Sequence, residues 1–356
     1  MNKFVFFGGK GGVGKTTVSC AYGLKCAREG LTTLVVSTDP AHSTSDVFDQ
    51  QFGDEPKAVE GHDDLWAMEL DPEEEVQRHM MEIKRTMSDQ VSPAIVNEID
   101  RQIELAHRTP GAHEAALFDR FIDVMREASA DASENANGEG NAARSTADSE
   151  RRSRERRPES DADGYDRVVF DTSPTGGTLR LLALPEFLES WIDRLLEKRE
   201  QSIDLYEKAA IGGRDPRQKM ERDPIIARLV ERKRLFEFAG ETLRNEAAFF
   251  LVLNPDELSI RETGRAIEEL TEYGLGVEGL VVNKIAPEPD ETEDGTGAKY
   301  LRERHRNERD RLRRIEDEFA EPVVARIVQR VEEVKGDLLE EVAVELDVEV
   351  APEASA

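Results

Sequence analysis

The sequence predicts an α/β fold in which a mostly parallel, twisted sheet is flanked by helices, with a helical subdomain inserted. Three observations support this prediction. Short apolar runs typical of buried strands recur along the chain, helical stretches separate them, and a glycine-rich loop follows the first run. Strands that alternate with helices form right-handed crossovers, which make the strands parallel and cover both faces of the sheet. The expected strands are residues 4–7, 33–37, 65–70, 168–171, 249–253, 280–283 and 323–328.

The loop after the first strand has the spacing of a phosphate-binding loop, which makes the fold class that of a P-loop NTPase. It reads Gly-Gly-Lys-Gly-Gly-Val-Gly-Lys-Thr-Thr over residues 8–17. Its glycines let successive backbone N–H groups turn towards a phosphate, and the following helix adds its N-terminal dipole. In this pattern Lys15 reaches the outer phosphates of ATP, and the Thr16 hydroxyl is a ligand for Mg²⁺. The expected nucleotide-binding residues of the loop are Gly9, Lys10, Gly11, Gly12, Val13, Gly14, Lys15, Thr16 and Thr17.

A second lysine, Lys10, stands at the leading edge of this loop. It lies too far forward to duplicate Lys15. Its ammonium can instead neutralise the charge that develops on the γ-phosphate, as an arginine finger does in other nucleotide hydrolases. We therefore expect both lysines to act in catalysis.

Two carboxylates follow predicted strands at the edge where open α/β sheets bind ligands. Asp39 ends the second strand and is followed by proline, so it is placed to orient or deprotonate an attacking water. The other interpretation of Asp39 is a helix cap for residues 43–48. Asp171 ends the fourth strand, where P-loop ATPases hold Mg²⁺, usually through its water. Residues 172–177 are then expected to be a flexible loop that senses the γ-phosphate.

The chain is expected to form a single ATPase domain over residues 1–350. Two helical segments, 72–127 and 185–246, interrupt the alternation and together predict the helical subdomain. Residues 128–164 predict a disordered acidic and polar insertion, because their apolar surface is too small to offset the entropy of ordering. An arginine-rich run inside this insertion either binds nucleic acid or an acidic partner, or is a solvated linker among acidic neighbours, which we favour. Residues 351–356 are a frayed tail.

The composition is strongly acidic, with a formal net charge of −28, 35% charged residues and 38% hydrophobic residues. This charge repels phosphate, so we expect no nucleic-acid partner. The 48 basic residues comprise 13 lysines and 35 arginines. Acid excess with few lysines is typical of a salt-accumulating halophile such as a halophilic archaeon, because molar salt shortens the Debye length to about 3 Å. The alternative is an ordinary acidic protein with an acidic loop.

The chain has two cysteines, Cys20 and Cys26, which lie six positions apart on the helix after the loop. This spacing suits neither a metal site nor a disulfide, so we interpret both as buried small hydrophobes. Met1 leads within two residues into the first strand, and no apolar stretch approaches the about 20 residues of a membrane-spanning helix. We therefore expect no signal peptide, no direct membrane insertion and a cytoplasmic location.

Several blocks of this sequence resemble the ArsA family of P-loop ATPases, which comprises arsenite-pump ATPases and the targeting factors of tail-anchored membrane proteins. The resemblance extends from residue 1 to about residue 345. Two switch-loop blocks and Lys10 distinguish this family from MinD and the nitrogenase iron protein. The blocks are the glycine loop with its extra lysine, Asp-Pro-Ala-His-Ser at 39–43, Asp-Thr-Ser-Pro-Thr-Gly at 171–176, Pro-Asp-Glu-Leu-Ser at 255–259, and Asn283.

The resemblance implies further roles for these residues and a homodimer. Lys10 becomes the signature lysine of the family, which commonly acts across a dimer that sandwiches the nucleotide. Asp39 becomes the residue that activates water. Thr16 ligates Mg²⁺ directly, and Asp171 holds it through a water.

Asn283 would read the adenine of ATP by the resemblance, because its amide matches a donor and an acceptor on the base, whereas a turn residue is the other interpretation. Asp256 falls where the family often has an acidic residue near the nucleotide. The chain also departs from the family: Gly177 replaces a frequent histidine, and Val328 replaces an adenine-contacting proline. Residues 284–320 hold no cysteine, so the zinc that many targeting factors share across the dimer is not expected.

Three functions follow from the resemblance. The first is an ATP-driven factor whose dimer opens and closes to target tail-anchored proteins or to chaperone hydrophobic segments, with the helical subdomain forming a groove for a client transmembrane segment. The second is the ATPase subunit of an arsenite or antimonite efflux pump, docked on a membrane receptor, although the cysteine cluster that binds arsenite is missing. The third is a nucleotide-gated positioning scaffold, which the acidic segment 337–346 disfavours because it would be repelled by anionic lipid.

Overall fold

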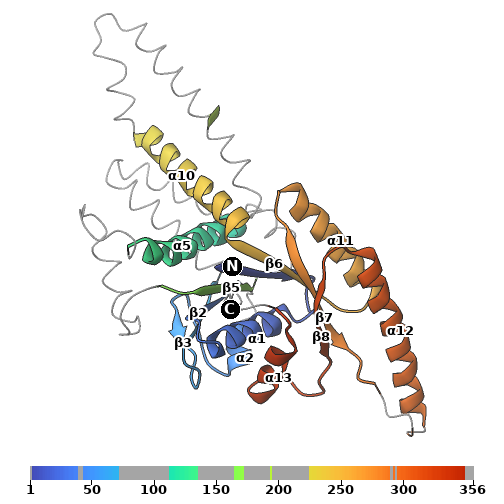
Figure 1. Cartoon of the computed structure of the whole chain (residues 1–356). Helices are drawn as coiled ribbons and strands as arrows, with labels where there is room; N and C mark the ends of the chain where they lie inside the picture. The colour runs from blue at the N-terminus through green and yellow to red at the C-terminus, as the bar shows by residue number, and fades with distance from the viewer. Residues whose placement is uncertain are drawn as a thin grey trace, which may run out of the picture.

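The computed structural model describes residues 2–38, 43–71, 112–134, 164–171, 193–194, 224–288, 292 and 295–348. These residues form one eight-stranded sheet with helices on both faces (Figure 1). The strands are β1 (Phe4–Gly9), β2 (Thr33–Ser37), β3 (Lys57–Ala58), β4 (Leu65–Glu69), β5 (Arg167–Asp171), β6 (Ala247–Leu253), β7 (Val277–Ile285) and β8 (Val323–Val328). The helices are α1 (Lys15–Arg28), α2 (Ser43–Phe48), α5 (Ala112–Glu134), α10 (Pro224–Asn245), α11 (Glu257–Glu272), α12 (Thr296–Glu318) and α13 (Asp337–Glu345).

The strands lie in the order β3-β4-β2-β5-β1-β6-β7-β8, and every neighbouring pair is parallel except β3 with β4. This confirms the predicted α/β fold class with a mostly parallel sheet. β1 is central, with β2 and β4 on one side and β7 and β8 on the other. The strand order reverses at β1. Parallel strands all have their carboxyl ends at the same edge of the sheet. The carboxyl ends of β1, β2, β5, β6 and β7 therefore lie at the edge where ligands bind in such sheets.

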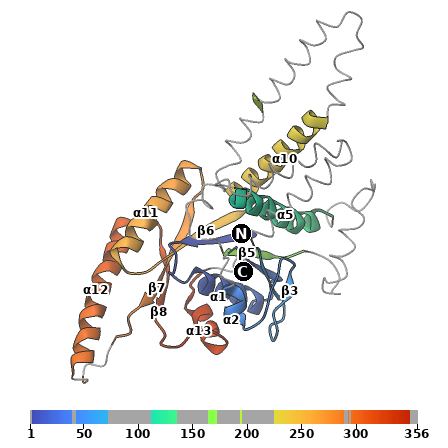
Figure 2. The same cartoon turned by 180° about the vertical axis from the view of Figure 1, so that it is seen from behind.

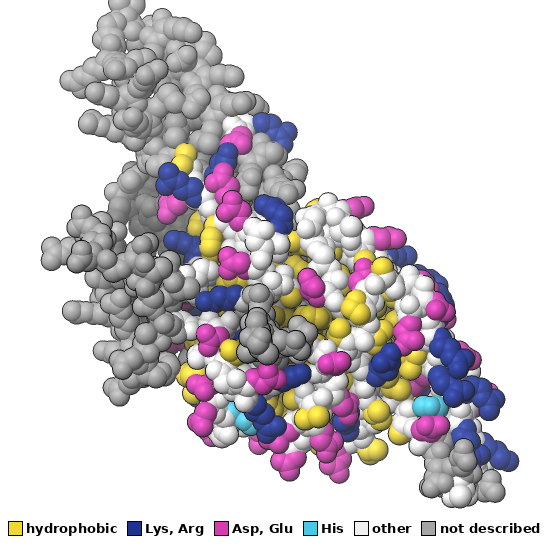
Figure 3. All heavy atoms as spheres, viewed as in Figure 1, with side chains coloured by type: hydrophobic (Ala, Val, Ile, Leu, Met, Phe, Trp, Pro, Cys, Tyr) yellow, Lys and Arg dark blue, Asp and Glu magenta, His cyan; other side chains and the backbone are white. Residues whose placement is uncertain are grey.

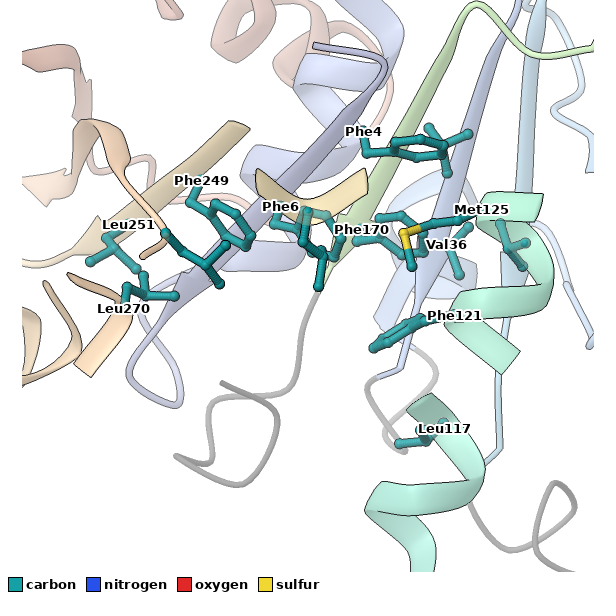
Figure 4. Close-up of a cluster of buried hydrophobic side chains, with 14 of the residues drawn as sticks. Phe4, Phe6, Val36, Leu117, Phe121, Met125, Phe170, Phe249, Leu251 and Leu270 are labelled. Atoms are coloured by element: carbon teal, nitrogen blue, oxygen red, sulfur yellow. The ribbon is translucent and has the colours of Figure 1, made fainter. Parts of the chain in front are cut away.

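Alternating strand residues enter two separate apolar cores, one on each face of the sheet. Phe6 of β1 lies in the core on the face covered by α5, α10 and α11. The preceding residue, Val5, lies in the core on the opposite face, which α1 and α13 cover (Figure 2). The Phe6 ring stacks between Phe170 of β5 and Phe249 of β6, at centroid distances of 4.6 and 4.9 Å (Figure 4). Stacked aromatic pairs stabilise a core beyond the area that they bury. This row ties together three strands whose carboxyl ends carry the site described below.

Helices α5 and α10 pack directly on the sheet. Phe121 of α5 meets the Phe170 ring edge-on at a centroid distance of 5.0 Å (Figure 4). Phe118 of α5 stacks with Phe236 of α10 at a centroid distance of 6.1 Å. Both helices fall in the segments that predict a helical subdomain, and in the structure they cover one face of the core. The parts of those segments at 72–111 and at most positions of 185–223 lie outside the described residues.

The structure differs from the predicted organisation at one boundary. Helix α5 continues to Glu134, past residue 128 where we expected disorder to begin. Ala128 is buried, and its carbonyl accepts a hydrogen bond from the Lys3 ammonium at 2.7 Å. These contacts offset part of the entropy of ordering, which the polar composition alone does not reveal. Residues 135–163 and the expected tail lie outside the described residues.

Strand β3 was not predicted. It pairs only Lys57 and Ala58 with β4, and both residues are exposed. A short, charged strand of this kind protects the edge of a sheet from pairing with other chains, and it has no apolar pattern to predict it. No helix among the described residues combines the length and the hydrophobicity that a membrane span requires.

Candidate functional site

The glycine-rich loop joins β1 to α1 at the carboxyl edge of the sheet. Gly9 and Gly14 both have left-handed backbone, with φ of 139° and 94°. A Cβ at Gly9 would lie 2.2 Å from the Val252 carbonyl oxygen, and a Cβ at Gly14 would lie 2.3 Å from Nδ2 of Asn283. Both positions therefore need glycine for their conformation and for the close approach of β6 and β7. A Cβ at Gly12 would meet no atom within 4 Å, so this side of the loop faces open space.

The two predicted lysines occupy different positions in this loop. Lys15, in the first turn of α1, is only 7% exposed, and its ammonium donates to the Lys10 carbonyl oxygen at 3.3 Å. The Val13 N–H points to the same oxygen at a long 3.5 Å. An ammonium and a backbone amide thus converge on one acceptor, which is the arrangement that a phosphate oxygen would use. The Lys10 side chain is half-buried and makes no hydrogen bond or ion pair with the described residues.

Thr16 and Asp171 are brought together although they are far apart in the sequence. The Thr16 hydroxyl donates to Oδ2 of Asp171 at 2.6 Å, and the Ser37 hydroxyl donates to the same oxygen at 3.2 Å. The backbone N–H of Thr38 donates to the Asp171 carbonyl at 3.1 Å. Asp171 is 1% exposed. The structure therefore places the predicted Mg²⁺ hydroxyl and the predicted Mg²⁺ carboxylate within one hydrogen bond of each other.

The helix after Asp39 lies beside the same hydroxyl. The Thr16 and Ser43 hydroxyl oxygens are 3.2 Å apart, and Ser43 begins α2. Glu69, at the end of β4, accepts from both the backbone N–H and the hydroxyl of Ser45 at 2.8 Å. This buried pair fixes the first turn of α2 to the sheet. Asp39 itself lies outside the described residues, so its role as the residue that positions water stays a prediction.

Asn283 and its neighbour Lys284 reach the outer side of the glycine loop from the end of β7. Nδ2 of Asn283 donates to the Val13 carbonyl at 2.8 Å, and Oδ1 of Asn283 accepts from the Lys284 N–H at 2.8 Å. The Lys284 ammonium donates to the Gly12 carbonyl at 2.6 Å. The Asn283 side chain therefore contacts the loop, and its contact with adenine stays a prediction.

Asp256 has a defined structural role. It is the N-cap of α11, and its carboxylate accepts from the Ser259 N–H at 2.9 Å. An N-cap carboxylate satisfies a helix amide that otherwise has no partner. Asp256 lies just beyond the carboxyl end of β6, at the edge that carries the site, and its proximity to a nucleotide stays a prediction. Thr17 lies in the first turn of α1, and Gly11 is exposed next to Gly12.

Both cysteines are buried on α1, as predicted. Burial raises the pKa of the Cys20 thiol well above its usual value. Burial also raises the pKa of Cys26 to about 11, although the nearby Arg167 guanidinium lowers it. A thiol must ionise to bind a soft metal or metalloid. Neither cysteine is therefore suited to bind arsenite.

The two thiols are expected to resist modification in the folded protein. With a pKa of about 11 in place of 9.0, the thiolate fraction of Cys26 at pH 8 is about 100-fold lower than that of an unperturbed thiol, and burial restricts access further. Titration with the reagent DTNB at pH 8 should show two thiols only after denaturation, and the native reaction should accelerate as the pH rises. Rapid modification of one native thiol at pH 8 would contradict the buried assignment.

The donor set fits Mg²⁺ bound together with a nucleotide. Mg²⁺ takes oxygen ligands and usually keeps several waters, with one or two protein oxygens and the phosphates of its substrate. The Thr16 hydroxyl and the Asp171 carboxylate supply such oxygens. Within the part of the chain that the structure describes, no group of three or more His, Cys, Asp or Glu side chains is arranged to hold a metal ion by itself. The expectation that no zinc is bound stays a prediction.

Three contributors to this site were not predicted from the sequence: Ser37, Glu69 and Lys284. Ser37 and Glu69 end β2 and β4, so the rule that polar residues gather at the carboxyl ends of parallel strands would have found them. Lys284 follows a predicted strand end directly, but nothing in its sequence context signals that its side chain turns back to the loop.

A protein-family comparison matches most of this chain. The model for anion-transporting ATPases, called ArsA_ATPase, matches residues 2–133 and 154–347. The stretch between the two matched ranges lies inside the polar segment 128–164. The matched ranges contain the glycine loop, both strand-end carboxylates and the Asn283 region.

Individual relatives are similar over nearly the whole chain. The chain is 30% identical over 333 residues to a protein of Aquifex aeolicus named "Putative arsenical pump-driving ATPase 2", covering 93% of this chain and 94% of the relative. It is 29% identical over 338 residues to the protein named "ATPase get3" of Aspergillus terreus, covering 94% and 87%. It is 28% identical over 287 residues to "ATPase ASNA1 homolog 1" of Paramecium tetraurelia, covering 80% and 75%.

Proposed function

This chain belongs to the ArsA family of anion-transporting ATPases, and we propose that it hydrolyses ATP in a homodimer whose opening and closing serves to target tail-anchored membrane proteins or to chaperone hydrophobic segments. The observation that carries the proposal is the bond between Thr16 and Asp171 beside a glycine loop with two lysines. Sequence-distant groups that P-loop ATPases use for Mg²⁺–ATP lie together at the carboxyl edge of the sheet. The printed names of two relatives, "ATPase get3" and "ATPase ASNA1 homolog 1", agree with the hydrolysis of ATP.

In the proposed reaction a water oxygen bonds to the γ-phosphorus of ATP, and the bond from that phosphorus to the β–γ bridging oxygen breaks. The products are ADP and phosphate, and the proton of the water passes to solvent through the residue that orients it, for which Asp39 is the candidate. Lys15 and the loop amides hold the phosphates, and Lys10 offsets the charge that develops on the transferred group. Thr16 and Asp171 would hold Mg²⁺, which when bound neutralises charge on the β- and γ-phosphate oxygens.

Two features support a coupling between this site and the helices on the sheet. Asp171 ends β5, and α10 follows it in the chain after residues that, except for 193–194, lie outside the described ones. Helix α10 packs against α5 through the Phe118–Phe236 stack and an ion pair between Arg232 and Asp119. We propose that a change after Asp171 passes into these two helices, which are packed together as one layer. Such a layer suits a surface that binds a hydrophobic client in one nucleotide state and releases it in another.

The described residues favour targeting over the two alternatives. An arsenite or antimonite pump subunit, which the name of the Aquifex aeolicus relative suggests, needs ionisable thiols, and both cysteines here are buried with raised pKa. A positioning scaffold that lies on membranes needs an exposed amphipathic helix that can contact the lipid. Helix α13 instead buries Leu339, Val342 and Ala343 against α1.

The proposed function is tested by client capture together with nucleotide binding, both in concentrated KCl. The purified full chain should bind Mg²⁺–ATP by calorimetry and sediment as a dimer when ATP is present. It should also retain a tail-anchored protein in solution. It should not retain a matched control protein in which two charged residues interrupt the transmembrane segment. Failure to bind Mg²⁺–ATP would overturn the ATPase assignment. Failure to retain the client in the ATP and ADP states would overturn the targeting role alone.

The acidic composition supports a finer proposal about the source. A formal net charge of −28 with 13 lysines among 48 basic residues suits the salt-rich cytoplasm of a halophilic archaeon. The effect of salt on stability, considered in the Discussion, tests this proposal independently of the ATPase activity.

A further inference from the structure

The last residues of β7 depart from regular strand geometry at Lys284. Its φ is 57°, in the left-handed region, and the register between β7 and β8 shifts between Val282 and Ile285. This bulge brings two successive side chains, those of Asn283 and Lys284, to the glycine loop. Bulges next to functional sites commonly redirect a side chain in this way.

The two side chains hold two successive carbonyls of the loop. Asn283 donates to the Val13 carbonyl at 2.8 Å, and the Lys284 ammonium donates to the Gly12 carbonyl at 2.6 Å. In a planar trans peptide the carbonyl and the N–H of the next residue point in opposite directions. Holding the carbonyls of residues 12 and 13 on the outside of the loop therefore directs the N–H groups of residues 13 and 14 towards its other side.

We propose that Lys284 is a positioning residue for phosphate binding: its bond to the Gly12 carbonyl pre-organises the loop amides for the phosphates of the nucleotide. The inference rests on the proposed function, because it requires that the loop binds a nucleotide. Lys284 acts through the loop, and it need not touch the phosphate.

The backbone conformation of Lys284 argues against a role as a simple turn residue. A left-handed conformation is strained for a residue with a Cβ, and glycine or asparagine adopts it more readily than lysine does. The exposed Lys284 side chain also gains nothing from burial. What the lysine adds is a charge-assisted hydrogen bond to the loop, and such bonds are stronger than neutral ones.

A pre-organised loop should improve the binding of ATP and ADP alike, because both present phosphates to the same amides. Loss of Lys284 should therefore weaken nucleotide binding and raise KM while kcat stays nearly constant. This pattern marks the loss of an interaction that is equal in the ground state and the transition state.

The test compares stability with affinity in two variants of Lys284 and in one control variant, all at left-handed positions. K284G removes the ammonium and relieves the backbone strain, so we expect a melting temperature about 1–3 °C higher but Mg²⁺–ADP binding roughly tenfold weaker, which corresponds to ~1.4 kcal/mol. K284R keeps a cationic donor and should restore most of the affinity. D64G is the matched control: Asp64 also has a φ of 57°, but it precedes β4 at the opposite edge of the sheet. It should gain stability without any change in affinity.

Calorimetric titration of the full-length protein with Mg²⁺–ADP in concentrated KCl gives the affinities, and thermal unfolding gives the stabilities. A higher melting temperature together with a weaker affinity in K284G, and a restored affinity in K284R, would support the inference. If K284G binds as tightly as the wild type, or loses stability and affinity together, the positioning role is wrong although the ATPase assignment stands. If the wild type binds no Mg²⁺–ADP, both the proposed function and this inference fall.

Discussion

Replacement of Lys10 by alanine should lower the single-turnover rate of ATP hydrolysis by about 10³-fold or more while Mg²⁺–ADP affinity stays within roughly threefold of the wild type. The Lys10 ammonium makes no bond with the described residues, so its removal breaks no contact that holds the loop. The charge that Lys10 is placed to offset develops only as the γ-phosphate departs. Its loss therefore acts on the transition state and not on the bound ground state.

Lys15 supplies the contrast for this experiment. Its ammonium is nearly buried in the loop, and it faces the same oxygen acceptor as the Val13 amide. K15A should therefore lose nucleotide binding itself, so the two lysines are separated by comparing a binding assay with a rate assay. A K10R variant would show whether a cation alone is enough, because arginine has the charge but not the shape of lysine.

The prediction for Lys10 has two contradicting outcomes with different meanings. If K10A hydrolyses ATP at the wild-type rate, Lys10 has no role in the chemistry. If K10A no longer binds Mg²⁺–ADP, Lys10 acts in the ground state, as Lys15 is expected to do. The measurement is a rapid-quench assay with enzyme in excess over ATP, which removes any contribution from product release.

Raising KCl from 0.1 to 2 M should increase the melting temperature by on the order of 10 °C. The formal net charge of −28 makes the folded chain repel itself. The Debye length falls from about 10 Å at 0.1 M salt to about 3 Å at 1 M, which removes most of the repulsion between exposed carboxylates. Figure 3 shows acidic side chains distributed over the visible face of the described residues, where solvent ions reach them.

Surface ion pairs oppose this effect, but they are too weak to reverse it. Arg314 binds both carboxylate oxygens of Glu257 at 2.9 and 2.8 Å, and Arg330 pairs with Glu345. Exposed pairs contribute about 0–1 kcal/mol each, and salt screens them in the same way. An ion pair removes one charge of each sign, so such pairs leave the net charge of −28 unchanged and the net effect of salt is stabilising.

Thermal unfolding at a series of KCl concentrations checks this prediction. Screening should produce most of the increase below about 1 M and then level off, because the Debye length changes little thereafter. A melting temperature that rises in proportion to salt up to 3 M would instead indicate strengthened burial of apolar surface. A melting temperature that stays constant or falls would contradict the proposal of a halophilic source.

The sequence was sufficient to place seven of the eight strands and the edge of the sheet where the glycine loop and Asp171 lie. The strand predicted at 33–37 was observed as Thr33–Ser37, and that at 323–328 as Val323–Val328. Buried parallel strands are continuous apolar runs, so a local pattern reveals them. The glycine spacing of the loop and Asp171 after its strand are local patterns of the same kind. These features follow from the preferences of neighbouring residues alone.

Only the tertiary structure decided which groups meet. The Thr16–Asp171 bond joins residues 155 positions apart, and the bonds from Asn283 and Lys284 to the loop cross about 270 positions. The same holds for the end of α5, where Ala128 is ordered by its contact with Lys3. Local propensity carries no information about such contacts, because their free energy depends on which strands lie side by side and on where a bulge directs a side chain. Lys284 is the clearest example: the sequence shows a lysine after a strand, and in the folded chain its ammonium donates to the Gly12 carbonyl of the glycine loop.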